Sequence, residues 1–356
     1  MTGKHIVVVG AGYAGLSAAA RAGRGDDTVT LVAPEERFAH RVRQHETAAG
    51  RPARRPAIAE VLRGRRVTHL RASVTELDLD HRKVFTDTGE TLAYDTLVYA
   101  LGSRTAWHGV PGAAEHAYPV ERAAELHRRI AEAPAPGTLA VVGGGAIGIE
   151  LATELAEAHP AWQIRIVAAD RVGGWFSDRG RAHVLRVMAG LGVRVDENTE
   201  VTAVTATGLE TTAGPVPADL VAWAASMEPH PLAARAGLAV DDRGRALVDD
   251  RLRSVSDPDV HVVGDAAAVD LPGIGLLRMG CATALPMGRY VGTLLSGGTD
   301  RPYRFTYATQ CLSLGRRNGL VQLIHPDDSM RPRILTGVAA RLTKAAIVNG
   351  VLMGLR

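Results

Sequence analysis

Two glycine clusters hold the residues whose types and spacing point most directly to chemistry. The pattern Gly-x-Gly-x-x-Gly occurs at Gly10, Gly12 and Gly15, and again at Gly143, Gly145 and Gly148. In dinucleotide-binding proteins the first glycine permits a tight turn, the second lets the backbone approach a pyrophosphate, and the third lets the helix pack on the strand. The helix that follows offers free N–H groups and its positive dipole end to the phosphates. Two clusters therefore predict two bound dinucleotides and electron transfer between them.

The residues around each cluster predict the elements that must position it. The apolar runs 5–9 and 138–142 precede the clusters, and alanine-rich helical stretches follow them. A single match is a weak signal, because ordinary tight turns in α/β sheets produce it too. Two matches, each between a buried strand and a helix, favour nucleotide binding over that alternative.

Both units depart from the usual pattern at the end of their second strand. An acidic residue there normally binds the ribose hydroxyls, but these strands end in Ala33 and Ala168. Glu35 and Asp170, two residues further on, are the substitute candidates. Asp170 favours the unphosphorylated ribose of NADH, whereas the neighbouring Arg171 would suit the 2′-phosphate of NADPH. Both coenzymes stay open, with NADH favoured.

Composition bounds the class of protein. At 356 residues, with 46% hydrophobic and 22% charged residues, the chain predicts a globular protein of two or three domains. No apolar run is long enough to cross a bilayer, and the first strand begins too early for a signal peptide, so we expect a cytoplasmic protein. Two cysteines make no disulfide framework, and the histidines lack zinc-finger spacing, so no metal site is predicted. The arginine-rich segment 51–66 lacks the interleaved aromatics of a nucleic-acid groove and is interpreted as a solvated face.

Three further segments predict strands and a return of the chain to the first unit. Segments 72–78 and 83–87 alternate as antiparallel strands do, and the buried strand 94–102 ends in Gly102. A later strand ends in Gly264-Asp265, which presents a carboxylate at the sheet edge where open α/β sheets bind ligands.

These motifs together resemble the pyridine-nucleotide-dependent FAD oxidoreductases, from the first strand to about residue 295. The resemblance implies an α/β fold with two Rossmann-like FAD/NAD(P)-binding domains of the three-layer ββα type. Because Asp265 and the first cluster would serve one FAD, the NAD(P) domain is expected to be inserted in the FAD domain. The expected ranges are 1–110 and 246–300 for the FAD-binding domain, 111–245 for the NAD(P)-binding domain and 301–356 for a short C-terminal segment.

The resemblance also implies roles for individual residues. FAD would contact Gly10, Gly12, Ala14, Gly15, Glu35, Val74, Gly102, Gly264 and Asp265, with Val74 at the adenine and Asp265 at the ribityl chain. NAD(P)H would contact Gly143, Gly145, Ile147, Gly148 and Asp170.

The segment after the first unit decides the branch of the family. Disulfide reductases need a redox cysteine pair there, but residues 38–46 contain no cysteine, which excludes a thiol relay. The chain therefore looks more like the type II NADH dehydrogenases and apoptosis-inducing-factor-like quinone reductases. In that branch a hydride passes to the flavin and electrons pass on to a quinone or another small-molecule acceptor, and the cofactors supply the chemistry. A biosynthetic tailoring oxidase reoxidised by O₂ and a redox-sensing flavoprotein stay open as alternatives.

Four residues are the catalytic candidates. Glu150, two residues after the second cluster, is expected near the nicotinamide and the flavin, where it positions the ring or relays a proton; the alternative is a helix-end carboxylate stabilised by the dipole. Arg43 and His45 would stabilise negative charge on the reduced flavin or an acceptor carbonyl, or else serve as an ion-pair partner and a core group. Cys281 lies in the stretch 278–288, before a predicted helix through Leu295 whose first N–H groups would face the flavin, so it is expected near the flavin; the alternative is a buried small hydrophobe. Sulfide oxidation would require Cys281 and Cys311 to meet.

The C-terminal stretch 338–355 predicts a helix of mostly apolar residues with Arg341 and Lys344 nearby. It is alanine-rich, with Asn349 and Gly350 in its middle, which favours a docking or dimer helix over a membrane helix. Peripheral membrane contact through this helix, and a monomer or a homodimer, stay open.

Overall fold

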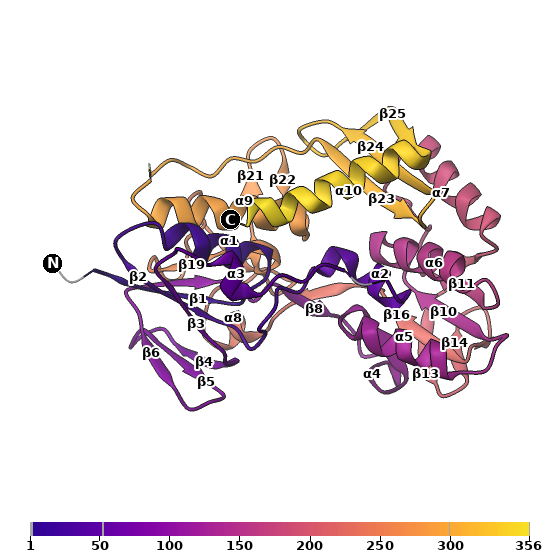
Figure 1. The fold of residues 1–356 in the computed structure, drawn as a ribbon, viewed down its shortest axis with the longest axis horizontal. Coiled ribbons are helices and arrows are strands. Elements are labelled where there is room, and N and C mark those ends of the chain that lie inside the picture. The colour runs from indigo at the N-terminus through magenta and orange to yellow at the C-terminus, as the bar shows by residue number, and fades with distance from the viewer. Residues whose placement is uncertain (1–2, 52, 299, 356) are drawn as a thin grey trace.

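Two five-stranded parallel sheets organise the fold of the computed structural model, which describes residues 3–51, 53–298 and 300–355 (Figure 1). The N-terminal residues Met1 and Thr2 lie outside the described residues. The first sheet has the order β19-β7-β1-β2-β3, and the second has the order β12-β11-β10-β16-β9. The first consists of β1 (His5–Val9), β2 (Thr28–Val32), β3 (Val67–Leu70), β7 (Thr96–Tyr99) and β19 (Val260–Val262). The second consists of β9 (Ala117–Pro119), β10 (Thr138–Val142), β11 (Gln163–Val167), β12 (Arg194–Asp196) and β16 (Leu220–Trp223).

The central strands are apolar along their whole length because both faces of each sheet are covered. In β1 the four residues after His5 are all buried, and β10 shows the same pattern. Parallel sheets are typically covered on both sides in this way, so their strands lack the alternation of half-exposed strands. The main covering helices are α1 (Tyr13–Ala22), α5 (Ala123–Glu132), α6 (Ala146–Ala158), α7 (Asp178–Gly190) and α9 (Cys281–Leu295).

Strand β19 closes the first sheet from a distant part of the sequence. It pairs in parallel with β7, with Val260 opposite Leu97 and Val262 opposite Tyr99. All five strands of the second sheet lie between β7 and β19 in the sequence. The second nucleotide-binding unit is therefore inserted into the first, as predicted.

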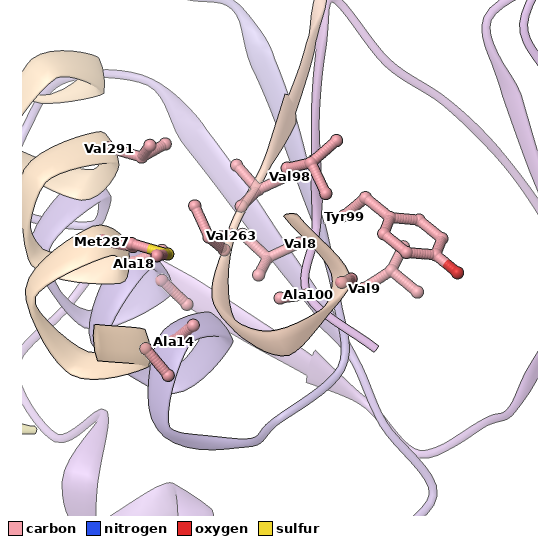
Figure 2. Packing of buried hydrophobic residues seen from close by; sticks show 14 of the residues in the cluster. Val8, Val9, Ala14, Ala18, Val98, Tyr99, Ala100, Val263, Met287 and Val291 are labelled. Carbon is pink, nitrogen blue, oxygen red and sulfur yellow. The ribbon is translucent and has the colours of Figure 1, made fainter. Parts of the chain in front are cut away.

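Helices α1 and α9 pack against one another at very short range over the first sheet (Figure 2). A Cβ atom on Gly288 would lie 2.0 Å from the carbonyl oxygen of Ala14, and one on Gly292 would lie 2.5 Å from that of Ala18. The absence of these side chains lets the two backbones approach, which fixes the start of α9 beside the first glycine turn.

The C-terminal segment forms a three-stranded antiparallel sheet crossed by a long helix. This sheet comprises β23 (Thr309–Leu314), β24 (Asn318–Ile324) and β25 (Met330–Thr336), and the helix is α10 (Gly337–Gly354). The predicted C-terminal helix is thus present. Figure 1 shows α10 running from this sheet, near α7, towards α9. Ala340, Lys344 and Val348 form its buried face.

A short helix from the first unit lies against the second unit. Helix α2 (Gln44–Ala48) follows the 3₁₀ turn Arg41–Arg43 and packs on α5 and α6.

Shorter strands and helices complete the fold. The remaining strands are β4 (Val74–Asp78), β5 (Lys83–Thr86), β6 (Thr91–Ala93), β8 (Ser103–Thr105), β13 (Val201–Thr205), β14 (Gly208–Thr211), β15 (Val216–Pro217), β17 (Met227–Pro229), β18 (Ala246–Leu247), β20 (Ala267–Ala268), β21 (Asp270–Leu271) and β22 (Gly275–Leu276). The remaining short helices are α3 (Ile58–Val61), α4 (Ala113–His116) and α8 (Leu232–Arg235).

Candidate active site

The first glycines of the two turns have similar backbone conformations and similar close contacts. Gly10 has φ +99°, and a Cβ on it would lie 2.5 Å from the carbonyl oxygen of Ala100. Gly143 has φ +113°, and a Cβ on it would lie 2.4 Å from that of Ala224. Both glycines are required because the chain turns tightly between the first strand and the helix of its unit.

The middle glycine of each turn faces open space. A Cβ placed on Gly12 or on Gly145 would meet no heavy atom within 4 Å. These glycines are the N-cap residues of α1 and α6, and no side chain caps either helix. The free N–H groups of both helix ends therefore face a cradle of the kind that holds a pyrophosphate. The residues present fit FAD at the first turn and NAD(P)H at the second.

The third glycine of each turn packs helix against strand. A Cβ on Gly15 would lie 1.9 Å from the carbonyl oxygen of Gly10, and a Cβ on Gly148 would lie 1.9 Å from that of Gly143. Any side chain at either position would push the helix away from its own turn.

Asp265 forms two hydrogen bonds beside the first glycine turn. Its carboxylate accepts hydrogen bonds from Ser103 Oγ (2.6 Å) and from the backbone N–H of Gly280 (2.7 Å). Gly264 before it has φ +75° and lies against Ala14 of α1. The segment after β19, the first residue of β8 and the start of α9 are therefore joined beside the first cradle.

Glu150 lies in a buried polar cluster that four segments build. Its carboxylate accepts a hydrogen bond from the backbone N–H of Ser313 (2.7 Å) and pairs with the ammonium of Lys344. The other carboxylate oxygen lies 3.7 Å from Nδ1 of His45, and His45 Nε2 lies 3.1 Å from Ser313 Oγ. We call Glu150, Lys344, Ser313 and His45 the buried cluster. It joins α6, α10, β23 and α2.

Burial sets the protonation of this cluster. Lys344 is 8% exposed, and removal from water lowers its pKa to about 7, an effect that Glu46 opposes and Arg43 reinforces. Burial also lowers the pKa of His45 well below its usual value, and the cations around it add to this. His45 is therefore neutral at pH 7, and burial makes Lys344 hold its proton less tightly than an exposed lysine does.

Arg43 pairs with Glu46 rather than with the buried cluster. Its guanidinium donates two hydrogen bonds, of 2.9 and 2.6 Å, to one oxygen of Glu46. Arg316, from the turn after β23, reaches Glu46 and the fully buried Glu154. The solvated face predicted for 51–66 is wrong at one position, because Arg51 also pairs with Glu154. These charges hold the first unit, α6 and the C-terminal sheet together.

Cys281 is the first residue of α9, so this helix begins five residues before Pro286, which the sequence predicts in its first turn. Burial raises the pKa of its thiol to about 11, and Asp265 adds to this. Burial raises the pKa of Cys311 to about 12, and the Cys281 thiol contributes. Both thiols are therefore protonated at neutral pH, which is unlike the thiolate of an activated cysteine.

The remaining residues predicted to contact the cofactors lie in loops or near the ends of strands and helices. Glu35 and Asp170 are exposed, in the loops that follow β2 and β11. Val74 begins β4, and Ile147 is half-buried in the first turn of α6. Gly102 has φ +64° with open space beside it, at the end of β7.

Sequence reasoning missed Lys344 and Ser313 as members of the site. One signal for Lys344 was present: the chain has only three lysines, and this one lies four residues from Ala340 and from Val348 on one helical face. A lysine on an apolar helical face is rarely left without a partner. Ser313 carries no comparable signal.

Comparison with known proteins decides the family. The family model for pyridine nucleotide-disulphide oxidoreductases matches residues 4–287. The chain belongs to this family. It is an FAD-dependent NAD(P)H oxidoreductase.

Relatives of this oxidoreductase cover nearly all of the chain. An NADH dehydrogenase-like protein of Mycobacterium tuberculosis is 31% identical over 374 residues, covering 96% of this chain and 92% of the relative. Demethylphylloquinone reductase of Synechocystis is 28% identical over 291 residues, covering 74% and 72%. The structure of NDH2 from Plasmodium falciparum in complex with NADH matches with a TM-score of 0.84 at 13% identity, covering 99% and 96%, and so supports the fold.

Proposed function

We propose that this oxidoreductase passes a hydride from NADH to FAD and then electrons to a quinone-like small molecule. The observation that carries the proposal is the buried cluster around Glu150. A carboxylate, a lysine and a serine meet where the NAD(P) unit, the segment after the first unit and the C-terminal helix converge. Reducing a quinone consumes a proton as well as a hydride, and such a cluster is suited to supplying it.

The relatives support the same acceptor class. Among them are a demethylphylloquinone reductase and a type II NADH:quinone oxidoreductase of Staphylococcus saprophyticus. The segment 38–46 offers no cysteine for a thiol relay. When FAD is bound it accepts the hydride, and the protein residues hold the reacting groups and exclude water.

NADH is the coenzyme that we propose. Asp170 lies in the exposed loop after β11, where its carboxylate would accept hydrogen bonds from the adenosine ribose. The proposal predicts that Asp170→Ser raises the KM for NADH and narrows the preference over NADPH. Equal use of both coenzymes by the unsubstituted protein would contradict it.

We further propose that α10 rests on a membrane surface that carries the quinone. Within the described part of the chain, no helix combines the length and hydropathy that a membrane crossing requires. However, Val338, Leu342 and Met353 on α10 are all more than half exposed. The exposed Arg331 and Arg333 of β25 precede this helix, and cations there favour an anionic lipid surface.

The deciding experiment is anaerobic stopped-flow of the flavin-loaded protein. Mixing with NADH should bleach the flavin rapidly, and mixing the reduced protein with a soluble quinone should restore its colour faster than O₂ does. Faster recovery with O₂ would favour a tailoring oxidase, and no bleaching with either coenzyme would favour a redox sensor.

Glu150→Gln tests the residue on which the proposal depends. It keeps the shape of the side chain and removes its charge, so we expect slower turnover with quinone at unchanged FAD content. Unchanged turnover would reduce Glu150 to a helix-end carboxylate.

A further inference from the structure

The loop after strand β11 carries the two residues that are expected at the adenosine ribose of the coenzyme. We call residues 168–177 the ribose loop; it contains Asp170 and Arg171, which are both exposed. An exposed loop recognises a ribose well only if its backbone keeps one conformation, because every other conformation lowers the fraction of protein that can bind. Val172, the next residue, is fully buried, so the loop is fixed directly beside these two side chains.

Both backbone hydrogen-bonding groups of Val172 are bonded to charged side chains. Its N–H donates to Oε1 of Glu197 at 2.6 Å, and its carbonyl oxygen accepts from Nε of Arg181 at 3.2 Å. Nη2 of Arg181 also donates to both carboxylate oxygens of Glu197, at 2.5 and 2.6 Å. The three residues therefore form a closed ring of hydrogen bonds. We call Arg181 and Glu197 the clamp.

The clamp joins two elements that flank the ribose loop. Arg181 lies in the first turn of α7, and Glu197 directly follows β12. Their side chains are only 16% and 24% exposed. Hydrogen bonds between a guanidinium and a carboxylate are about twice as strong as neutral ones, and the planar guanidinium also fixes their direction. The pair is therefore suited to holding a backbone segment in one place.

The residue that the clamp holds also packs against the second glycine turn. A Cβ on Gly144 would lie 3.1 Å from Cα of Val172, and the N–H of Gly173 donates to the carbonyl oxygen of Gly144 at 3.1 Å. The ribose loop and the turn that would hold the pyrophosphate are thus in direct contact. A shift of Val172 would change the distance between the two parts of the site.

We propose that Arg181 and Glu197 are positioning residues for the coenzyme, which hold Val172 so that Asp170 stays within reach of the adenosine ribose of NADH. The inference rests on the proposed function, because it assumes that NADH binds at the second glycine turn. Both residues act through the ribose loop, so their loss should lower the affinity for NADH and leave the hydride step unchanged.

Anaerobic stopped-flow of the FAD-loaded protein measures the Kd for NADH and the limiting rate of flavin bleaching separately. Arg181→Lys keeps a cation but loses the planar fork that reaches both Glu197 and Val172. Glu197→Gln keeps the shape of the side chain and loses its charge. In both variants we expect the Kd for NADH to rise by about tenfold and the limiting rate to stay within about twofold. Arg186→Met, at an exposed position of the same helix, should change neither.

Two fragments of the coenzyme separate the ribose loop from the rest of the site. ADP-ribose contains the adenosine half of NADH, and isothermal titration calorimetry should show a loss of about tenfold in its affinity for the clamp variants. Reduced nicotinamide mononucleotide lacks this half, so it should bleach the flavin of the variants as fast as that of the unsubstituted protein. Slower bleaching by this mononucleotide in the variants would indicate a general disturbance of the fold and would overturn the proposal.

An exchange of the two charges distinguishes the clamp from a simple ion pair between α7 and the segment after β12. The double variant Glu197→Arg/Arg181→Glu keeps opposite charges at the two positions. However, a guanidinium has no acceptor for the N–H of Val172, and a carboxylate has no donor for its carbonyl oxygen. The double variant should therefore bind NADH as weakly as the single variants do. Affinity equal to that of the unsubstituted protein would overturn the proposal, because ion pairing alone would then be sufficient.

The failure of the inference and the failure of the proposed function give different results. If NADH bleaches the flavin of the unsubstituted protein and the clamp variants bind NADH and ADP-ribose equally tightly, the inference fails and the proposed function stands. If neither NADH nor NADPH bleaches the unsubstituted protein, the proposed function fails, and a coenzyme role of the clamp fails with it.

Discussion

Substitutions of single glycines in the first cradle should distinguish effects on FAD affinity from effects on the free energy of unfolding. Gly12 has φ −71° and faces open space, so a methyl group there fits the free protein but occupies the approach of the pyrophosphate. We expect Gly12→Ala to leave the free energy of unfolding of the FAD-free protein within about 0.5 kcal/mol. FAD affinity should fall by about tenfold to 100-fold, the equivalent of 1–3 kcal/mol of overpacking. Denaturant unfolding and flavin titration measure the two quantities.

Gly15→Ala is the matched comparison within the same turn. Its methyl group would lie 1.9 Å from the backbone oxygen of Gly10, so the helix must shift even without FAD. We expect it to lower the free energy of unfolding by about 3 kcal/mol. If Gly12→Ala and Gly15→Ala had the same free energy of unfolding, the prediction would be wrong, because the turn would then accommodate the methyl group at residue 15 without cost.

His261 makes stability depend on pH. It is 5% exposed in β19, its Nδ1 has no partner within the described ranges, and burial lowers its pKa to about 4. The unfolded chain binds a proton near pH 6.5 and the folded protein does not, so stability is complete above pH 6.5 and falls as pH drops towards 4. The loss from His261 should be about 2 kcal/mol between pH 7 and 5.

Denaturant midpoints across this pH range measure the effect. His261→Gln should flatten the pH dependence, whereas His116→Gln, an exposed position, should not. An equal slope in both variants would assign the pH dependence to other groups, such as the buried His40.

Among the secondary-structure elements, helix α10 has one face buried against the protein and one apolar face exposed to solvent. Ala340, Lys344 and Val348 face the protein, whereas Val338 and Leu342 are 54% and 52% exposed. Replacing an outward-facing apolar side chain should change the free energy of unfolding little, because that side chain is already largely exposed to water. Leu342→Glu should therefore keep stability and weaken binding to anionic vesicles by about tenfold, through lost burial in lipid and added repulsion.

Co-sedimentation with vesicles that contain anionic lipid measures this binding. Ala182→Glu adds the same charge at an exposed position of α7 and should leave binding unchanged. If the unsubstituted protein does not sediment with vesicles, the outward face of α10 has another partner, and an oligomeric-state measurement would test a second copy.

At the scale of the whole molecule, the first sheet needs both ends of the sequence. Strand β19 covers the edge of β7, and Asp265 follows it directly beside the first cradle. A fragment that ends at residue 245 lacks both, so it should not retain FAD. The second sheet draws all its strands from residues 117–223, so the fragment 111–245 should fold alone and bind NADH.

Flavin absorbance and nucleotide titration of the two fragments measure these outcomes. FAD retention by the shorter chain would mean that the first unit is complete without β19. Failure of 111–245 to fold would show that α2 and the C-terminal sheet, which pack on α6, contribute to its core.

Local sequence determined the parts of the protein that depend on neighbouring residues. The two turns, the strands before them and the helices after them follow from a few adjacent residues, because glycine conformation and helix starts are local properties. The carboxylate of Asp265 was also predictable, since the carboxyl ends of parallel strands meet at one sheet edge. Glu150, Arg43 and His45 were named from position, and the structure brings His45 to Glu150 while it directs Arg43 to Glu46.

Only the tertiary structure decided how the site is completed. Lys344 and Glu150 are 194 residues apart, and their contact depends on how α10 crosses β23 and β24. No local pattern encodes that crossing, because it results from packing between surfaces that are formed separately. The same packing takes Lys344 out of water, and this burial, not the residue type, lowers its pKa into the neutral range.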